Sequence, residues 1–222
     1  MRKYLFYVIL LFLTSCGQKY ASNPSLVELV DMDYRFSNKQ LMQFCHENNI
    51  KKENVFQWQN HWCIYTDEQQ VDSLAARLDT SFPLLKIDIY KKPFYNFNRE
   101  KLTGEKPASE WTHILMTANL VNDSSLQKQY MEYHRTQFEK WPEVSKGFIH
   151  ADFQQVLVFR TGRQLMLVIS IPQGKTLDEL NPKTTENNPR VNEWNKIMAK
   201  YQEGIDDAPK GTTWVMFSSI SN

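Results

Sequence analysis

The sequence predicts an α+β fold built from two tandem split βαβ units, the element order of ferredoxin-like domains. Segments follow one another as strand, helix, strand, strand, helix, strand, and this order occurs twice along the 222 residues. The strands of the second half are almost continuous apolar runs, which is typical of a sheet covered on both faces. Helices would cover one face. The other face needs a second sheet, from the first half or from another copy of the protein, and we expect the first half.

The first half, residues 16–92, has the complete order of one such unit. Four segments have the length and apolar character of strands: residues 26–32, 55–58, 62–65 and 84–90. Ser37 is a suitable N-cap for the first helix, because Gln40 three residues later completes a capping box. The second helix is predicted from an apolar stripe at helical spacing, formed by Val71, Leu74, Ala75 and Leu78.

Residues 93–109 are the predicted linker between the halves. Pro93, Gly104 and Pro107 interrupt any regular pattern there. Three aromatic residues in the same segment indicate that it packs against a domain: Phe94, Tyr95 and Phe97.

The second half, residues 110–222, repeats the order. Its strands are predicted over residues 111–121, 153–159, 165–171 and 213–220. Ser124 and Gln127 predict a capped helix that continues to about Phe138. Asn188 and Pro189 begin a last helix that ends at Gly204. The segment between residues 172 and 188 is long for a loop in a compact domain, so it is a candidate lid over a pocket.

Residues 1–15 are predicted to be a lipoprotein signal peptide. A basic pair opens the chain, and the apolar run over residues 4–13 is shorter than the roughly 20 residues that span a membrane. The sequence LTSC at positions 13–16 resembles a bacterial lipobox, which implies cleavage before Cys16 and lipidation of its thiol. An ordinary signal peptide that contains a cysteine is the alternative. We expect a membrane-anchored lipoprotein of the bacterial cell envelope, facing the periplasm or the exterior.

Composition excludes several classes of function. The formal net charge of +1 gives no reason to expect nucleic acid as a partner. Histidines at metal-binding helical spacing and the HExxH motif are both missing from the sequence, so we predict no metal site. There is also no G-x-S-x-G, P-loop or dinucleotide fingerprint. Cys45 and Cys63 lie in helix and strand patterns, where we expect free buried thiols, although an exported compartment permits a disulfide.

The helix after residue 124 carries the densest group of candidate site residues. Leu126, Tyr130, Tyr133, Gln137 and Trp141 form one broad stripe at helical spacing. Burying Gln137 without a partner would cost about 1–3 kcal/mol, so it needs a ligand hydroxyl or a protein group. A core helix with one satisfied glutamine explains the stripe equally well.

Three further residues could take part in chemistry or binding. His134 follows Tyr130 by one turn, and histidine titrates in the range that suits acid–base work, although a structural role is the alternative. Gln155 shares one face of its strand with Phe153, Leu157 and Phe159. Trp194 offers a platform for a sugar ring, or is an ordinary core residue.

These elements resemble the L-rhamnose mutarotase family. The resemblance covers about residues 111–220 and depends on Tyr133, on the Trp-Pro-Glu segment eight residues later, on the paired strands, and on Trp194 in the last helix. It implies a ferredoxin-like unit that pairs as a dimeric α+β barrel. It also implies interconversion of the anomers of a deoxy-hexose without a cofactor.

The family pattern places a tyrosine and, one turn later, a histidine on the first helix. Tyr133 matches the tyrosine, but Gln137 stands at the histidine position. A second family tyrosine corresponds to about Gln155, and Trp194 matches a pocket aromatic. The resemblance therefore implies Tyr133 and His134 as proton-transfer candidates, and Gln137, Trp141, Gln155 and Trp194 as sugar-binding groups.

Three functions are consistent with these residues. The first is a lipid-anchored mutarotase that acts on a deoxy-hexose or a related pyranose. The second is a non-catalytic carbohydrate-binding lipoprotein on the same scaffold, which the glutamine at position 137 favours. The third is an interaction module with a filled pocket and no affinity for sugars. We expect a monosaccharide as the partner and the internal pairing of sheets to imitate the family dimer within a monomer.

Overall fold

The structure is a computed structural model that describes residues 23–220. The predicted signal peptide, residues 1–15, and Cys16 lie outside this range. Within the described range, no helix is long and apolar enough to cross a membrane. The fold is a mixture of helices and two antiparallel sheets, as predicted for an α+β protein.

The first half has the predicted order of elements. Its strands are β1 (Pro24–Val30), β2 (Val55–Trp58), β3 (His61–Asp67) and β4 (Lys86–Tyr90), and its helices are α1 (Asn38–Glu47), the short η1 (Lys52–Asn54) and α2 (Val71–Ser81). The strands pair in the order β2-β3-β1-β4. Ser37 caps α1 as predicted, with its backbone N–H and its hydroxyl both donating to Gln40 Oε1.

The second half repeats this strand order. Strands β6 (Trp111–Leu120), β7 (Gln155–Thr161), β8 (Gln164–Pro172) and β10 (Val215–Met216) pair in the order β10-β6-β8-β7, and β9 (Gln202–Glu203) also pairs with β6. The helices of this half are α4 (Ser124–Arg135), α5 (Gln137–Lys140), α6 (Pro142–His150), α7 (Leu177–Leu180), η2 (Asn181–Thr185) and α8 (Pro189–Met198).

The segment predicted as a linker contributes to the second sheet. Residues Tyr95–Asn98 form β5, an edge strand antiparallel to β7, and Arg99–Thr103 form α3. Phe97 is fully buried in the core of the second half, and Tyr95 is nearly so. The aromatic residues therefore account for the packing, while Pro93 lies just before β5 and Gly104 is the C-cap of α3.

The predicted closing strand divides between the two sheets. Val215–Met216 (β10) pair with β6, whereas Ser218–Ser219 (β11) pair with β2 of the first sheet. Phe217 lies between them, buried, and its N–H donates to Leu115 O. The end of the chain thus connects the two sheets.

Two local predictions about the first helix of the second half are wrong. The N-cap is Asp123, whose carboxylate accepts hydrogen bonds from the N–H groups of Ser125 and Leu126, whereas Gln127 donates to Val121 O. The helix also ends at Arg135, and a break at Thr136 separates it from α5. The last helix begins at Pro189 as predicted but ends at Met198, before Gly204.

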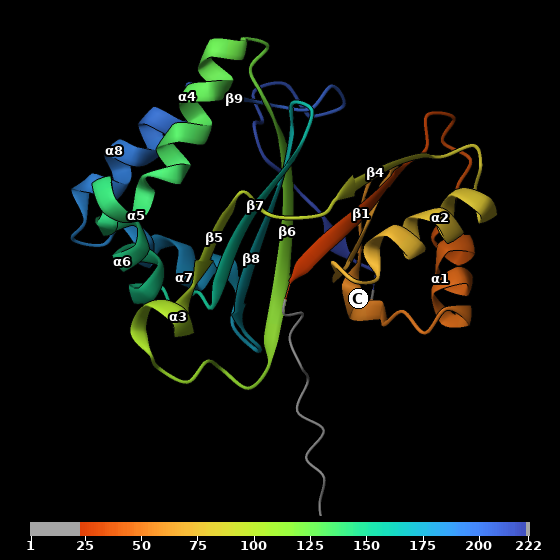
Figure 1. The fold of residues 1–222 in the computed structure, drawn as a ribbon, viewed down its shortest axis with the longest axis horizontal. Helices are drawn as coiled ribbons and strands as arrows, with labels where there is room; N and C mark the ends of the chain where they lie inside the picture. The colour runs from red at the N-terminus through yellow and green to blue at the C-terminus, as the bar shows by residue number, and fades with distance from the viewer. Residues whose placement is uncertain (1–22, 221–222) are drawn as a thin grey trace, which may run out of the picture.

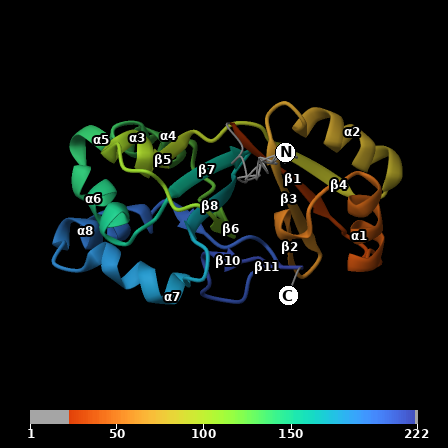
Figure 2. The ribbon, with the colours of Figure 1, turned by 90° about the horizontal axis from the view of Figure 1, so that it is seen from below.

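Helices cover the outer face of each sheet, and the inner faces meet (Figures 1 and 2). One buried cluster joins the first sheet to α1 and α2, and a second joins the other sheet to α4, α6 and α8. A third cluster contains side chains from both sheets, among them Leu26 and Phe56 of the first sheet and Phe159 and Val168 of the second. The continuous apolar strands of the second half are therefore covered on both faces, as predicted.

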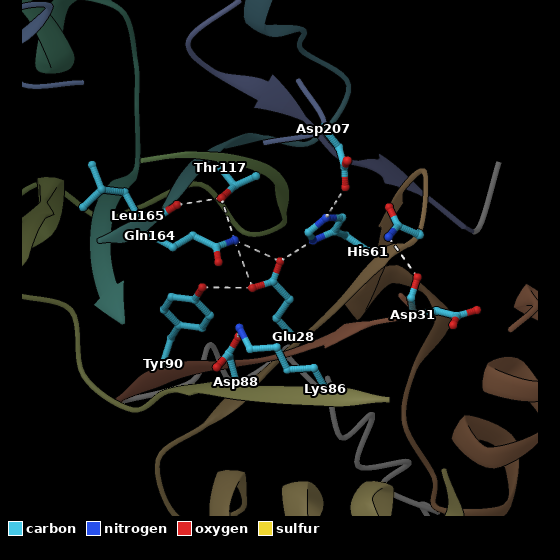
Figure 3. A network of polar contacts seen from close by, with 11 residues as sticks. Glu28, Asp31, His61, Lys86, Asp88, Tyr90, Thr117, Gln164, Leu165 and Asp207 are labelled. Atoms are coloured by element: carbon cyan, nitrogen blue, oxygen red, sulfur yellow. Dashed lines mark hydrogen bonds and ion pairs between the residues drawn. The ribbon is translucent and has the colours of Figure 1, made fainter. Parts of the chain in front are cut away.

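A buried polar network also crosses between the sheets (Figure 3). Glu28 of β1 is fully buried, and its carboxylate contacts His61 Nδ1 at 2.8 Å and accepts a hydrogen bond from the Tyr90 hydroxyl at 2.9 Å. From the second sheet, Gln164 Nε2 lies 3.1 Å from each Glu28 oxygen and 3.1 Å from Thr117 Oγ1. The contact surface between the two sheets therefore contains a buried polar network within an apolar cluster.

Candidate active site

A cavity of about 360 Å³ lies between the second sheet and its helices. Its floor is apolar and comes from β7 and β8, while α4, α8, β5 and the C-terminal segment supply aromatic and polar groups. The polar and aromatic lining residues are Tyr95, Tyr130, His134, Phe148, Phe153, Asn181, Trp194, Asn195, Gln202 and Trp214. A mostly apolar cavity of this size with a few polar groups is typical of a small-molecule site.

His134 lines the cavity as a neutral base. Its Nδ1 lies 3.0 Å from the backbone oxygen of Tyr130, and because a carbonyl only accepts, Nδ1 carries the proton. Burial lowers the pKa of His134 to about 4. The unprotonated Nε2 has no hydrogen-bond partner among residues 23–220, so it is available to a ligand. The ring is held by aromatic contacts with Phe94, Tyr95, Tyr130 and Trp194.

Tyr130 lies one helical turn before His134 and lines the same cavity. The two rings are 4.3 Å apart between centroids. Burial raises the pKa of the Tyr130 phenol, so the hydroxyl keeps its proton at neutral pH. Gln202 Nε2 donates to the Tyr130 hydroxyl at 3.1 Å, and Trp214 Nε1 donates to Gln202 Oε1 at 3.1 Å. Tyr130 and His134 thus have the one-turn spacing that the resemblance implies for the family pair.

Gln137 belongs to the core and does not line the cavity. It is fully buried, with Nε2 donating to Trp141 O at 2.6 Å and contacting Ser145 Oγ at 3.1 Å. The Tyr95 hydroxyl donates to Gln137 Oε1 at 2.8 Å. Protein groups therefore satisfy this side chain, contrary to the expectation that a sugar hydroxyl would do so.

Tyr133 and Trp141 lie on the outer side of the helix layer. They line a separate surface hollow together with Lys128, Glu132 and Lys140. The Tyr133 ring contacts Trp141, Trp194 and Tyr201, and the Arg190 guanidinium lies 3.8 Å from the centre of the Trp141 ring. The expected single pocket with Tyr133, Gln137, Gln155 and Trp194 is therefore not found, because only Trp194 of these four lines the cavity.

Gln155 faces away from the cavity. On β7, Val156 and Val158 belong to the core under the helices, whereas Leu157 and Phe159 belong to the cluster between the sheets. Since alternate residues of a strand point to opposite faces, Gln155 shares the face of Leu157. The tyrosine opposite His134 is instead Tyr95 of β5, whose ring centroid is 5.3 Å from that of His134.

The long segment after β8 packs against the helix layer and adds one residue to the cavity. It forms α7 and η2, and Asn181 lines the cavity. Gly147 of α6 allows the close approach, because a Cβ at this position would lie 2.5 Å from Thr184 O. The segment predicted as a candidate lid therefore forms part of the cavity wall.

Sequence patterns missed several residues of this site: Tyr95, Asn181, Asn195, Gln202 and Trp214. The aromatic run at 94–97 was a signal for the first of them. The others come from separate segments and have no common spacing. No group of three or more His, Cys, Asp or Glu in the described part of the chain is arranged to hold a metal ion. Cys45 and Cys63 are free and buried, as predicted.

Comparisons with known proteins agree with the resemblance found in the sequence. The family model described as L-rhamnose mutarotase matches residues 114–220. A UPF0734 protein of Dictyostelium discoideum is 29% identical over 97 residues, which are 41% of this chain and 71% of that protein. An L-fucose mutarotase of Xanthomonas campestris pv. campestris is 27% identical over 97 residues, 43% of this chain and 75% of the relative.

Among solved structures, a protein provisionally described as a chlorite dismutase aligns over 88% of this chain and 93% of its own. The TM-score of 0.29 and the 13% identity are too low for an argument about fold or function. The sequence comparisons, together with the Trp-Pro-Glu segment and the elements around it, confirm the resemblance of the C-terminal half of the chain to the L-rhamnose mutarotase family.

Proposed function

We propose that the protein interconverts the anomers of a monosaccharide in the cavity between the second sheet and its helices. One observation carries this proposal: a neutral histidine and a protonated tyrosine lie one helical turn apart in the same cavity. In this proposal the catalytic pair is Tyr130 and His134, rather than Tyr133 and His134 as the sequence pattern predicted. Trp194, Trp214 and the amide side chains would bind the sugar ring and its hydroxyls.

The reaction needs one base and one acid, and it involves no net transfer of protons between the sugar and the protein. His134 Nε2 takes the proton of the anomeric hydroxyl while the C1–O1 bond becomes a carbonyl. The bond between C1 and the ring oxygen breaks, and the ring oxygen takes the proton of the Tyr130 hydroxyl. Rotation about C1–C2 presents the other face of the aldehyde, and the reverse proton transfers close the ring and restore both side chains.

The names of the relatives guide the choice of substrate. L-Rhamnose and L-fucose are both 6-deoxy-hexoses, so we propose a 6-deoxy-hexose or a related pyranose as the substrate. An apolar methyl group at C6 suits the floor of the cavity, which Val156, Val158, Leu167 and Ile169 supply.

The test is the rate of anomer exchange, measured by saturation-transfer NMR with L-rhamnose and L-fucose. Tyr130→Phe removes only the hydroxyl and should lower the protein-catalysed rate by about 10²-fold or more, the usual size of a proton-transfer contribution. His134→Asn keeps a donor toward Tyr130 O but removes the base, and should have a similar effect. Tyr133→Phe is the matched control on the same helix and should retain the rate. Full activity of Tyr130→Phe would overturn the assignment.

The alternative function is a carbohydrate-binding protein without catalysis. The glutamine at position 137 favoured it in the sequence, but in the structure His134 supplies a base that Gln137 lacks. Under this alternative the wild-type protein binds the sugars, broadens their NMR signals and leaves the exchange rate at its uncatalysed value.

We also propose that a lipid on Cys16 anchors the protein in the bacterial cell envelope. The support is the basic start, the short apolar run and the LTSC sequence at positions 13–16. Cys16→Ser should release the protein from membranes, as followed by fractionation and immunoblotting, and should leave its thermal unfolding unchanged. A variant that stays in the membrane fraction would contradict the lipid anchor.

Finally, we propose that the two halves form an internal pseudo-dimer, which imitates within one chain the dimeric α+β barrel of the family. The repeated strand order and the apolar cluster shared by the two sheets support this interpretation. A monomer in solution at micromolar concentration, measured by light scattering, is the expected result, and a stable dimer would contradict it.

A further inference from the structure

We propose that Gln202 is a positioning residue that holds the Tyr130 hydroxyl as a hydrogen-bond donor toward the cavity. The inference rests on the proposed function for its activity readout, and it identifies the ligand atom that faces Tyr130 as a hydrogen-bond acceptor. The residues that carry it are Tyr130 on α4, Gln202 on β9 and Trp214 just before β10.

The orientation of the Gln202 amide is fixed by Trp214. An indole N–H can only donate, and Trp214 Nε1 lies 3.1 Å from Gln202 Oε1. The amide oxygen therefore points to Trp214 and the amide nitrogen points to Tyr130. A flipped amide would set two donors against each other at Trp214.

This orientation fixes the role of the tyrosine. Gln202 Nε2 lies 3.1 Å from the Tyr130 hydroxyl oxygen, so that oxygen accepts. Gln202 is the one hydrogen-bond partner of this hydroxyl that the structure gives within residues 23–220. The hydroxyl proton therefore needs an acceptor from outside the protein, because a buried donor without a partner is unfavourable.

The ligand atom that fits is an oxygen that accepts the Tyr130 proton, and in the proposed reaction it is the ring oxygen of a pyranose. The Tyr130 oxygen already accepts from Gln202, so the hydroxyl acts as a donor toward the ligand. The hydrogen bond from Gln202 also lowers the pKa of the phenol against the effect of burial, which stabilises the oxygen as it gives up its proton.

Strand pairing holds both supporting residues in place. Gln202 pairs with Leu120 of β6, and Val215, directly after Trp214, pairs with Thr117 of the same strand. The donor direction at Tyr130 is therefore set by one strand of the sheet and does not depend on a surface loop.

The sharpest test is Gln202→Glu, which keeps the shape of the side chain. An ionised carboxylate accepts from Trp214 and also from Tyr130, so it draws the phenol proton away from the cavity. We expect the exchange rate at saturating L-rhamnose or L-fucose to fall by about 10²-fold at pH 7.5. A protonated carboxyl group can donate to Tyr130 as the amide does, so the rate should recover as the pH is lowered toward 5. The wild-type protein should show no such recovery after the uncatalysed rate is subtracted.

The control is Gln129→Glu, the same change at an exposed position of α4, which should leave the rate and its pH profile unchanged. The dissociation constant of the same sugar, measured by NMR line broadening, is a second readout that does not require turnover. In Gln202→Glu we expect this constant to increase with rising pH, which means weaker binding. Two results for Gln202→Glu would overturn the positioning role. One is a loss of exchange rate that does not depend on pH and accompanies a loss of thermal stability. The other is an exchange rate at pH 7.5 equal to that of the wild-type protein. A wild-type protein that neither binds nor exchanges the sugars would overturn the proposed function itself, and with it this role.

Discussion

At the scale of single residues, hydrogen bonds already made within the protein decide which polar side chains remain for a ligand. Gln137 has its carbonyl and its amide group engaged by Tyr95, Trp141 and Ser145. Among residues 23–220, His134 Nε2 and the Tyr130 hydroxyl proton have no protein partner in the cavity. His134 is therefore preferred over Gln137 as a candidate ligand-binding residue because it has an unused hydrogen-bonding atom, and not because of its spacing in the sequence.

Gln137→Leu should destabilise the protein, because it removes the hydrogen bonds of Gln137 with the Tyr95 hydroxyl, the Trp141 carbonyl and the Ser145 hydroxyl. Each of these three bonds contributes about 0.5–1.5 kcal/mol, so we expect a loss on the order of 3 kcal/mol in the free energy of unfolding. Urea denaturation monitored by tryptophan fluorescence measures it, with Gln173→Leu at an exposed position as the control. An unchanged midpoint for Gln137→Leu would argue that these groups find other partners.

Stability should also fall in mild acid because of two buried histidines. Burial lowers the pKa of both His134 and His113 to about 4, whereas a histidine in the unfolded chain has a pKa of about 6.5. Below about pH 6.5 the unfolded chain therefore binds protons that the folded protein does not. Stability is complete above that pH and is lost progressively down to about pH 4, by up to roughly 1.4 kcal/mol per pH unit for each histidine.

Urea midpoints at pH 7.0, 5.5 and 4.5 test this dependence. His113→Asn should reduce the slope between pH 6.5 and 4 by about half of the histidine contribution, because one of the two groups is removed. A slope that does not change in this variant would show that other groups dominate acid unfolding.

The sequence pattern named His134 and Trp194, which line the cavity, but it paired the histidine with Tyr133, which lines the surface hollow instead. Counting back from Trp141 assumes one continuous helix, in which each residue turns by about 100°. Tyr133 lies before the break at Thr136 and is turned by about 100° from its neighbour His134, so the two side chains point in different directions. Gln137 lies after the break, and its side chain is in the core. Gln202 and Trp214 reach the site through strand pairing, which no local spacing records.

At the scale of elements, the start of α4 gives a matched pair of variants. Asp123→Ala removes the acceptor for two backbone N–H groups and should cost about 0.5–2 kcal/mol in the free energy of unfolding. Ser124→Ala changes the residue that the sequence pattern predicted as the cap, and it should be nearly neutral because Asp123 supplies the cap. Chemical denaturation of the two variants decides between the caps, and a larger loss for Ser124→Ala would contradict the structure.

Elements with strong periodicity were predictable, and short ones were not. The strands of both halves and helices α1, α2 and α8 follow from apolar spacing and caps. Strand β5 was missed because four residues close to Pro93 carry too little pattern. The division of the closing strand into β10 and β11 depends on which sheet edge lies beside each residue, and that is decided by packing of the two halves.

At the scale of the whole molecule, the network around Glu28 links the two sheets (Figure 3). Gln164→Leu removes the contribution of the second sheet to the buried carboxylate and should cost about 1–3 kcal/mol in the free energy of unfolding. Gln173→Leu, an exposed position just after β8, is the control and should change stability by no more than about 0.5 kcal/mol. Equal stability of the two variants would show that the cross-sheet contact contributes little.

The meeting of the sheets also predicts how the halves behave when separated. The second sheet presents five fully buried side chains to the first: Leu115, Leu157, Phe159, Met166 and Val168. Without the first half this apolar face is exposed to water, at a cost of about 25 cal/mol for each Å². A fragment of residues 108–222 should therefore dimerise or aggregate, and residues 93–222 are the better test because they include β5.

Size-exclusion chromatography with light scattering should find the 93–222 fragment as dimers or larger species. Adding the separately expressed residues 23–92 should convert it to a 1:1 complex, because the first sheet offers the complementary face of Leu26, Phe56 and Tyr65. Phe159→Lys in the fragment should weaken both associations, since a charge would then lie in the contact surface. A fragment that stays a stable, soluble monomer and ignores residues 23–92 would contradict the packing of one half on the other.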